Sequence, residues 1–379
     1  MTYELQPIVC VVGTRPEAIK MAPVIQALRA APWAQCRVLF TAQHRDLAAP
    51  VLEYFGIRPD VDLDVMRAGQ SLADLGNRLL VRLHDALQRE RGALVLAQGD
   101  TVSVAAAAMA SFILGMPFGH VEAGLRTHRL DAPFPEEANR VLASHLATVH
   151  FAPTAAARAN LIREGIPASA IHVTGNTVID ALVMAARQGD PLPLELGPGN
   201  RLVLVTLHRR ENLGAPTRRV CEAIRILHDR FQDIELLWPV HPNPRIRPVI
   251  ETALRGLPRV RLCDPLGYGP FVAALKASTL VLTDSGGVQE EAPALGKPTL
   301  VLRESSERTE SIGWGTSRLV GLDPQRIVAA ASRLLEDEEE RQRMCRVVNP
   351  YGDGNAAQRI VATLQRLLPL RHEPLSVAG

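Results

Sequence analysis

Short apolar runs rich in β-branched residues recur along this chain, and each ends in a polar or glycine-bearing turn that opens a stretch of helical length. Alternation of this kind is typical of a parallel α/β sheet. The pattern occurs once in each half of the 379 residues, so it predicts two α/β domains of moderate size. The predicted strands are 8–12, 37–41, 93–97, 117–121 and 149–152, followed by 201–207, 234–240, 260–263, 279–283 and 298–302.

The domain boundary is expected between the two series of strands. A segment rich in proline and glycine, 187–200, precedes the second series. We place the boundary earlier, near residue 170, because 171–174 has the composition of a strand and would open the second series. The expectation is one domain over 1–170 and another over 171–354. We expect the two domains to face each other across a cleft, where ligands commonly bind.

The charge balance excludes one class of partner. Lysine and arginine together number 42 and aspartate and glutamate 40, so the formal net charge is 42 − 40 = +2. Nucleic-acid-binding proteins usually carry a basic excess, and an aromatic content of 4% gives little surface for base stacking. We therefore expect no nucleic-acid partner. Only Lys20, Lys276 and Lys297 are lysines, so a lysine is a candidate for a specific role in this arginine-rich chain.

Cysteine usage and hydropathy favour a soluble, reduced, cytoplasmic protein. The five cysteines are scattered and form no CxxC pair, which disfavours a zinc ribbon, an iron–sulfur site or a disulfide framework. The N-terminus lacks a basic stretch before an apolar segment of signal length. The uncharged stretch 101–119 consists mostly of small residues and is interrupted by Gly-Met-Pro. It predicts a buried helix followed by a short strand, not a membrane span.

Polar clusters follow the predicted strands of the first half. After 8–12, Thr14 and Glu17 have the spacing of a helix-capping box, and Arg15 and Lys20 add two cations near the same helix start. A helix start exposes N–H groups to an anion, so we favour anion binding here over a capped helix alone.

Three carboxylates, Asp100, Glu122 and Glu136, follow at later strand or helix ends. They could simply cap helices or complement helix dipoles. If they converge, neighbouring like charges and burial would separate their pKa values, as acid–base chemistry requires. Spacing alone leaves both interpretations open.

In the second half, the segment 283–291 (TDSGGVQEE) is the most specific signal. Gly286 and Gly287 would let backbone N–H groups approach a phosphate at a helix start, beside the hydroxyl of Ser285. Glu291 could reach ribose hydroxyls, and Arg303 and Arg308 follow the next strand. Neither GxGxxG nor GxxxxGK[ST] is present, which weakens a dehydrogenase or P-loop interpretation. The histidine of 239–244 would need further ligands to form a metal site, and we find none.

Taken together, these stretches resemble the non-hydrolysing bacterial UDP-N-acetylglucosamine 2-epimerases over nearly the whole chain. The matching segments are GTRPEAIKMAP (13–23), TAQHR (41–45), QGDT (98–101), GHVEAGLRT (119–127), PFPEEANR (133–140), TGNTVIDAL (174–182), HRREN (208–212), PVHPNP (239–244), TDSGGVQEEAPALGKP (283–298) and NPYGDG (349–354). The resemblance implies a glycosyltransferase-B-like architecture of two Rossmann-like domains with substrate between them. It also implies that a C-terminal segment, 355–379, returns to the first domain as a helix.

The resemblance further implies an isomerase that interconverts UDP-N-acetylglucosamine and UDP-N-acetylmannosamine, used to make precursors of cell-surface polysaccharides. UDP would be eliminated to leave 2-acetamidoglucal and then added back, with no metal or redox cofactor and in a homodimer. The catalytic residues implied are Asp100, Glu122, Glu136 and His208. Those implied to hold the diphosphate are Arg15, Lys20, Ser285, Gly286, Gly287 and Arg308, with Glu291 at the ribose and Leu266 and Phe271 at the uracil. A second, activating UDP-N-acetylglucosamine would meet Gln43, His44, Arg209 and His241.

Other functions remain open on the sequence. A glycosyltransferase of the same two-domain architecture would use a UDP-sugar but would need an acceptor site. A hydrolysing 2-epimerase would release free N-acetylmannosamine. A non-enzymatic UDP-sugar sensor would have no need for three carboxylates together with His208.

Overall fold

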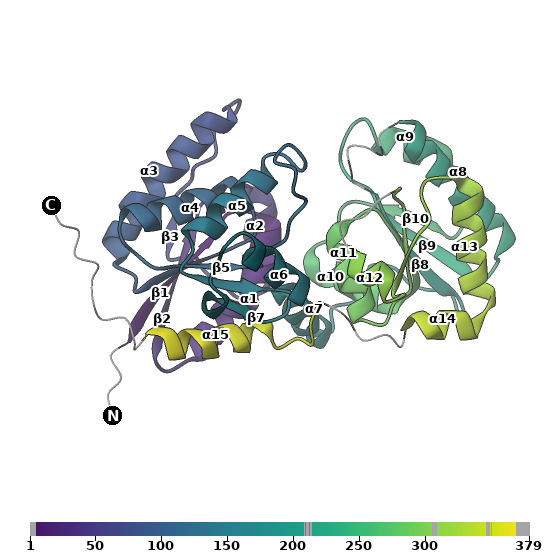
Figure 1. Cartoon of the computed structure of the whole chain (residues 1–379). Coiled ribbons are helices and arrows are strands. Elements are labelled where there is room, and N and C mark those ends of the chain that lie inside the picture. The colour runs from purple at the N-terminus through teal and green to yellow at the C-terminus, as the bar shows by residue number, and fades with distance from the viewer. Residues whose placement is uncertain are drawn as a thin grey trace. The chain divides into compact units, whose positions relative to one another are not determined.

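The computed structural model describes residues 5–207, 209, 212, 214–304, 309–345, 349 and 351–368, with side chains omitted for 309 and 310. The chain divides into two compact units (Figure 1). The first unit comprises Met1–Met184 and Tyr351–Gly379, and the second comprises Ala185–Pro350.

The first unit is built on a parallel sheet with the strand order β3-β2-β1-β4-β5-β6-β7. Buried apolar runs form its centre, with Ile8, Val9 and Cys10 of the first strand fully inaccessible. The strands are β1 (Gln6–Val12), β2 (Ala34–Phe40), β3 (Val61–Asp62), β4 (Leu94–Gln98), β5 (Phe118–Val121), β6 (Val149–Ala152) and β7 (Ile171–Val173).

Helices connect these strands and cover the sheet (Figure 1). They are α1 (Arg15–Ala30), α2 (Arg45–Tyr54), α3 (Leu72–Glu90), α4 (Val102–Ile113), α5 (Glu136–Leu146), α6 (Ala155–Arg163), a 3₁₀ turn (Ala168–Ala170), α7 (Thr177–Gln188) and α15 (Ala356–Leu367). Helices α3, α4 and α5 pack side by side, and α1 packs with α2 and α15. The stretch 101–119 forms the buried helix and short strand expected of it. Among the described residues, no helix is long and apolar enough to cross a membrane.

The second unit repeats the same plan with the strand order β10-β9-β8-β11-β12-β13, again all parallel. Its strands are β8 (Arg201–Thr206), β9 (Ile234–Pro239), β10 (Val260–Cys263), β11 (Ser278–Thr283), β12 (Thr299–Val301) and β13 (Ser317–Leu319). Its helices are α8 (Ala215–Arg230), α9 (Arg247–Leu254), α10 (Tyr268–Ala277), α11 (Gly286–Ala294), α12 (Thr309–Gly313), α13 (Pro324–Glu336) and α14 (Glu338–Cys345).

Both units contain the strand order of a Rossmann fold, in which the first strand lies beside the fourth. The predicted fold class, two Rossmann-like α/β domains, is therefore confirmed. The order reverses between β1 and β4 in the first unit and between β8 and β11 in the second. Loops at the carboxyl ends of these strand pairs are where doubly wound folds bind ligands.

The boundary between the units lies later than residue 170. The segment 171–174 does contain a strand, but β7 pairs with β6 and completes the first sheet, so it does not open the second. The division falls after Met184, inside α7. The chain re-enters the first unit at Tyr351, and α15 then packs on α1.

Candidate active site

Two loops meet where the strand order of the first sheet reverses, and Glu17 joins them. Its Oε2 accepts hydrogen bonds from the backbone N–H of Gly13 (2.6 Å) and Thr14 (3.3 Å) after β1. Its Oε1 accepts from the Thr101 hydroxyl at 2.6 Å, beside Asp100 after β4. Burial raises the pKa of the Glu17 carboxyl above its ordinary value. The predicted capping box is present, and its carboxylate also fixes the second loop.

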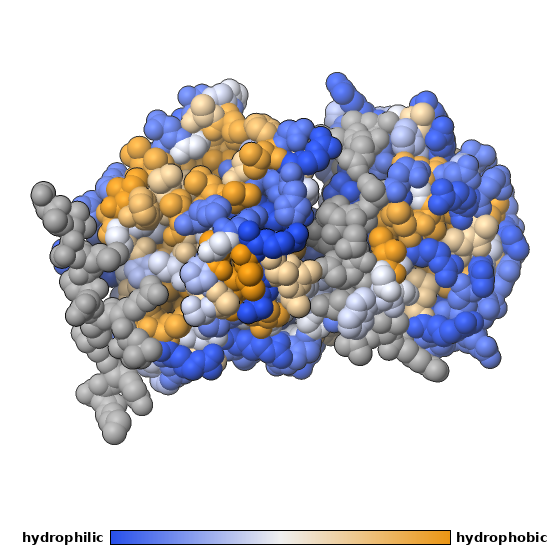
Figure 2. All heavy atoms as spheres, viewed as in Figure 1, coloured by the Kyte–Doolittle hydropathy of each residue, from blue (hydrophilic) through white to orange (hydrophobic). Residues whose placement is uncertain are grey.

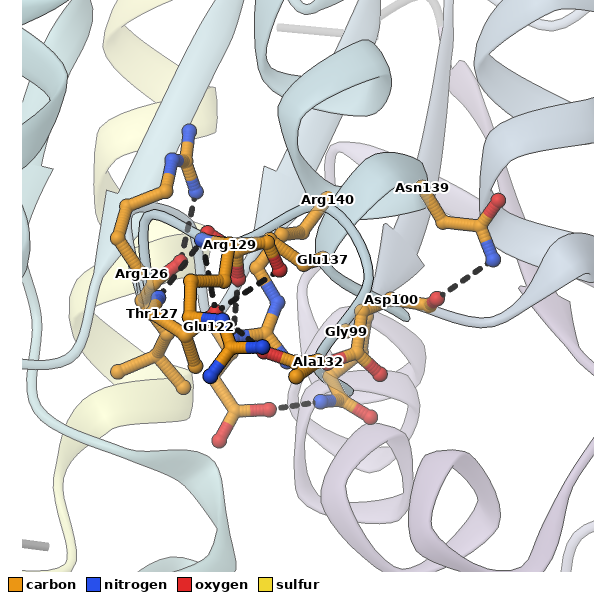
Figure 3. A network of polar contacts seen from close by, with 12 residues as sticks. Gly99, Asp100, Glu122, Arg126, Thr127, Arg129, Ala132, Glu137, Asn139 and Arg140 are labelled. Carbon is orange, nitrogen blue, oxygen red and sulfur yellow. Dashed lines mark hydrogen bonds and ion pairs between the residues drawn. The ribbon is translucent and has the colours of Figure 1, made fainter. Parts of the chain in front are cut away.

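Asp100 follows β4 and faces the first turns of α5 (Figure 3). Its carboxylate pairs with the guanidinium of Arg140, and its backbone carbonyl accepts from Asn139 Nδ2 at 3.0 Å. Arg140 also pairs with Glu137 at 3.1 Å. Arg140 thus fixes the position of the Asp100 side chain, which is still partly exposed.

Glu122 follows the neighbouring strand β5 and is the most completely surrounded of the three predicted carboxylates. Its Oε1 accepts from Lys20 Nζ at 2.6 Å and from Asn176 Nδ2 at 2.9 Å, and its Oε2 accepts from Gln98 Nε2. The Glu122 side chain is only 6% exposed. Its φ of +64° is left-handed, a strained conformation for a residue with a side chain. Strain of this kind is common at functional sites.

A buried histidine supports the turn before Asp100. His120 Nε2 lies 2.7 Å from the carbonyl of Gly99, so it is the protonated nitrogen of a neutral ring. Burial lowers the pKa of His120 to about 3, which keeps the ring neutral at physiological pH. Its Nδ1 lies 3.4 Å from the Ser144 hydroxyl, which accepts from Arg126 at 3.0 Å.

Glu136 and Glu137 open α5 but differ in their surroundings. Glu137 is buried, and its Oε1 accepts from the backbone N–H of Thr127 (3.0 Å) and His128 (2.9 Å), so it holds the preceding loop. Glu136 is half-buried. The helix that carries Glu136 also carries the partners of Asp100, so the three predicted carboxylates lie on neighbouring elements.

Three other predicted residues lie around the end of β1. Arg15 is half-buried at the first position of α1. Gln43 is buried and accepts from the Ser103 hydroxyl at 2.7 Å. The backbone N–H of His44 donates to Gly13 at 2.9 Å, and burial lowers the pKa of the His44 imidazole.

In the second unit, Asp284 organises the loops where that strand order reverses. It is fully buried, and its Oδ2 accepts from the backbone N–H of Arg209 (3.0 Å) and from Asn212 Nδ2 (2.8 Å). Ser285 follows as the N-cap of α11, which begins with Gly286 and continues with Gly287. The predicted phosphate-binding sequence therefore does lie at a helix start after a strand.

The remaining predicted residues of this unit lie along α10, α11 and the loop after β9. Glu291 is buried and accepts from the Tyr268 hydroxyl at 3.2 Å. Leu266 and Phe271 are half-buried near the start of α10. His241 is exposed, and its Nδ1 accepts from the backbone N–H of Asn243 at 3.2 Å. His208 and Arg308 lie outside the described residues.

Sequence reasoning missed two residues that organise these loops and underestimated two others. Gln98 and Asn176 lie in the segments QGDT and TGNTVIDAL, where residue type and position gave no reason to single them out. The sequence predicts Glu17 as part of a helix cap and Asp284 as part of the phosphate-binding segment, but it does not predict that each of them fixes a neighbouring loop. Among the described residues, no group of three or more histidine, cysteine or acidic side chains could hold a metal ion.

Comparison with known proteins agrees with this geometry. A family model described as UDP-N-acetylglucosamine 2-epimerase matches residues 26–365. The UDP-N-acetylglucosamine 2-epimerase of Escherichia coli K12 is 47% identical, over 94% of this chain and 98% of its own. The crystal structure of the Neisseria meningitidis UDP-GlcNAc 2-epimerase bound to UDP-GlcNAc has a TM-score of 0.88 at 41% identity, covering 95% of this chain and 100% of its own. The Methanocaldococcus jannaschii UDP-GlcNAc 2-epimerase, in complex with UDP-GlcNAc and UDP, has a TM-score of 0.79 at 31% identity over the same two shares.

The chain forms two Rossmann-like units, with carboxylates and a glycine-bearing helix N-terminus at the points where the strand orders reverse. These features define an enzyme of nucleotide-sugar chemistry with a glycosyltransferase-B-like fold. The chain belongs to the UDP-N-acetylglucosamine 2-epimerase family.

Proposed function

We propose that this protein reversibly inverts C2 of UDP-N-acetylglucosamine to give UDP-N-acetylmannosamine, without releasing free sugar. The observation that carries the proposal is Glu122, a buried carboxylate fixed by Lys20 at the carboxyl edge of the first sheet, next to the strand that ends at Asp100. Relatives at 31% and 41% identity have been crystallised with UDP-GlcNAc.

The reaction is an elimination followed by an addition. A base removes the C2 proton, the C2–H electrons form the C1=C2 bond of 2-acetamidoglucal, and the C1–O bond breaks so that UDP leaves with its electron pair. A proton then reaches C2 from the other face, and a phosphate oxygen of UDP adds to C1. Each half needs a positioned acid or base and stabilisation of the departing diphosphate, and neither half oxidises or reduces the sugar.

The first unit supplies the groups for the sugar ring in this proposal. Asp100, Glu122 and Glu136 are the acid–base carboxylates, and Arg15 and Lys20, both on α1, are assigned to the diphosphate. Glu122 is paired with Lys20 and Asp100 with Arg140, so each of these two carboxyl groups has a cationic partner in the structure.

The second unit supplies the groups for UDP. Ser285, Gly286 and Gly287 present the N-terminus of α11, which suits a diphosphate, and Asp284 keeps the neighbouring loop in place. Glu291 is assigned to the ribose, and Leu266 and Phe271 to the uracil. His208 and Arg308, outside the described residues, are assigned to the diphosphate.

We further propose that a second UDP-N-acetylglucosamine activates the enzyme at Gln43, His44, Arg209 and His241. His44 supports this because its backbone contacts Gly13, two residues before Arg15. A ligand at His44 would therefore act on the loop that carries Arg15. The proposed setting is the cytoplasm, where the product would feed cell-surface polysaccharide synthesis.

The proposed assembly is a homodimer. Large apolar side chains gather on the first unit over α3, α4 and α5 (Figure 2). Phe112 and Ile113, at the end of α4, are 64% and 56% exposed, and Leu142 on α5 is 40% exposed. Apolar groupings on a folded surface commonly mark a protein interface.

The experiment that tests the function is proton NMR of the purified protein with UDP-N-acetylglucosamine in deuterated water. We expect an equilibrium mixture with the manno epimer and deuterium at C2. Unlabelled starting material recovered from a folded protein would contradict the proposal. Free N-acetylmannosamine with free UDP would instead support the hydrolysing alternative, and sugar transfer only upon addition of an acceptor would support a glycosyltransferase.

A further inference from the structure

The surroundings of Glu122 fit an ionised carboxylate. Its oxygens accept hydrogen bonds from the Lys20 ammonium and from the side-chain amides of Gln98 and Asn176. A protonated carboxyl would turn one oxygen toward a donor with an O–H of its own. Because an ionised carboxylate is an acceptor only, donors on both oxygens favour the charged form.

The orientation of the Asn176 amide is fixed by its other contacts. Asn176 directly precedes α7, and its Oδ1 accepts from the backbone N–H of Val178 at 3.1 Å. The NH₂ group is thereby left to face Glu122, at 2.9 Å from Oε1. Asn176 is 2% exposed, so this amide meets Glu122 in a largely dry environment.

The backbone of Asn176 is anchored where the chain re-enters the first unit. Its N–H donates to the carbonyl of Tyr351 at 2.7 Å. Gly175, at a φ of +90°, lies against Gly352, and a Cβ at Gly175 would be 3.4 Å from the Gly352 Cα. The segment 351–352, far along the chain from Asn176, therefore holds the backbone of Asn176 in place.

We propose that Asn176 is a positioning residue that keeps Glu122 ionised and oriented, so that Glu122 takes the C2 proton of the epimer it faces. The C2–H bond breaks, an O–H bond forms on Glu122, and the C2 electrons enter the C1=C2 bond as UDP leaves. Another group returns a proton on the opposite face. This role rests on the proposed epimerase function.

Other titratable groups near Glu122 come from several elements. Lys20 contacts it from α1, and the neutral ring of His120 lies two residues away on β5. Asp100, after β4, is paired with Arg140 of α5. A substitution at Asn176 leaves all of these groups unchanged, so its effect on Glu122 can be separated from theirs.

The test replaces Asn176 with aspartate. Asn176→Asp keeps the shape but places a second carboxylate against Glu122, and a like charge at this distance raises the pKa of a carboxyl. The acid limb of the kcat/KM–pH profile should move to higher pH by about one unit or more. Asn176→Ser keeps an acceptor for α7 but removes the donor to Glu122, and it should move the limb in the same direction by less.

The chain contains a matched control in the second unit. Asn200 Nδ2 donates to Glu235 Oε1 at 3.0 Å, the same amide–carboxylate pairing away from the proposed site. Asn200→Asp should leave the profile where it is. Carboxyl ¹³C NMR titration of the wild type and each variant, with Glu122→Gln to assign the signal, follows Glu122 without any need for turnover.

Each outcome decides the matter. The inference is supported if both Asn176 variants show a higher pKa for Glu122 and an acid limb of kcat/KM at higher pH, while Asn200→Asp shows neither. An unmoved Glu122 signal overturns it, and so does a uniform loss of rate at every pH, which is the mark of a merely structural role. If the pKa of Glu122 rises but the acid limb of the kcat/KM–pH profile stays where it is, Glu122 is not the proton acceptor. A wild type that forms no epimer refutes the proposed function, whatever the titration shows.

Discussion

Glu122 shows how a single side chain acquires a defined charge state from its neighbours. A buried carboxylate without partners would be protonated, since burial disfavours charge. Lys20 and two amides reverse that tendency, and Lys20 is one of three lysines in the chain. A compact ammonium suits this contact, whereas the larger guanidinium of arginine demands a wider, forked site.

Single substitutions test whether the four proposed catalytic residues take part in the reaction. Asp100→Asn, Glu122→Gln, Glu136→Gln and His208→Ala should each lower kcat by roughly 100-fold or more with the fold intact, as expected for lost acid–base or leaving-group assistance. Steady-state kinetics measure kcat, and circular dichroism shows whether the fold is intact. Glu336→Gln, which breaks a surface pair with Arg230, is the control and should keep the normal rate. Near-normal rates in all four variants would refute the site assignment.

The buried His120 predicts a pH dependence of stability. Its pKa is lowered by burial to about 3, so between this value and the ordinary 6.5 the unfolded chain binds a proton that the folded chain does not. Stability should therefore fall as the pH drops below about 6.5, by at most about 1.4 kcal/mol per pH unit for this group. His120→Gln keeps a donor for Gly99 and should reduce the difference in Tm between pH 7 and pH 5. His145→Gln, at an exposed position, is the control and should leave this difference in Tm unchanged. An unchanged difference in His120→Gln would contradict the role of His120 in the pH dependence.

The sequence predicted which residues lie at turns and helix starts better than it predicted which residues they contact. Thr14, Glu17, Ser285 and the two glycines after it could be placed because capping and turn chemistry are local. The partnership of Asn176 with Glu122 spans 54 positions and depends on how β5 and β7 enter the same sheet, which no local pattern encodes.

At the scale of elements, the order of strands places the loops. Both sheets reverse their order next to their first strand, so the loops after β1 and β4, and after β8 and β11, are adjacent without any special sequence. The apolar runs predicted nearly all of these strands to within a few residues. The two-residue β3 and the three-residue β13 were not predicted, because so short a run carries little signal. The sheet to which β7 belongs depends on long-range pairing, which composition does not show.

The return of α15 to the first unit depends on an acidic cap supplied from another helix. Asp180 of α7 accepts from the backbone N–H of Ala356 at 3.2 Å and of Ala357 at 2.8 Å. Asp180→Asn turns an NH₂ group toward one of these donors and should lower the free energy of unfolding by about 1 to 3 kcal/mol. Urea unfolding and limited proteolysis after α7 measure the loss.

A matched substitution tests whether this effect belongs to the buried cap. Asp323, exposed at the start of α13, accepts from Arg326 N–H at 3.0 Å, and Asp323→Asn should be nearly neutral because asparagine is an equally good cap. Equal losses in the two variants would contradict a special role for Asp180.

At the scale of the whole molecule, the apolar surface over α4 and α5 predicts an assembly. The double substitution Phe112→Asp and Ile113→Asp should convert a dimer into monomers, because burying two carboxylates at an interface is costly. Light scattering coupled to size exclusion measures the mass. Trp314→Asp changes an equally exposed residue of the second unit and should leave the dimer intact. A wild-type monomer would exclude the proposed dimer outright.

The division of the first unit between the two ends of the chain has a consequence for biosynthesis. Residues 185–350 must all be translated before α15 can reach α1, which at cellular speeds takes roughly 10 to 30 seconds. During that interval the apolar surface that α15 will cover stays open on the ribosome, and Asp180 has no helix to cap. The second unit is continuous in sequence and can finish folding first. The first unit is therefore the first to be translated and the last to be completed.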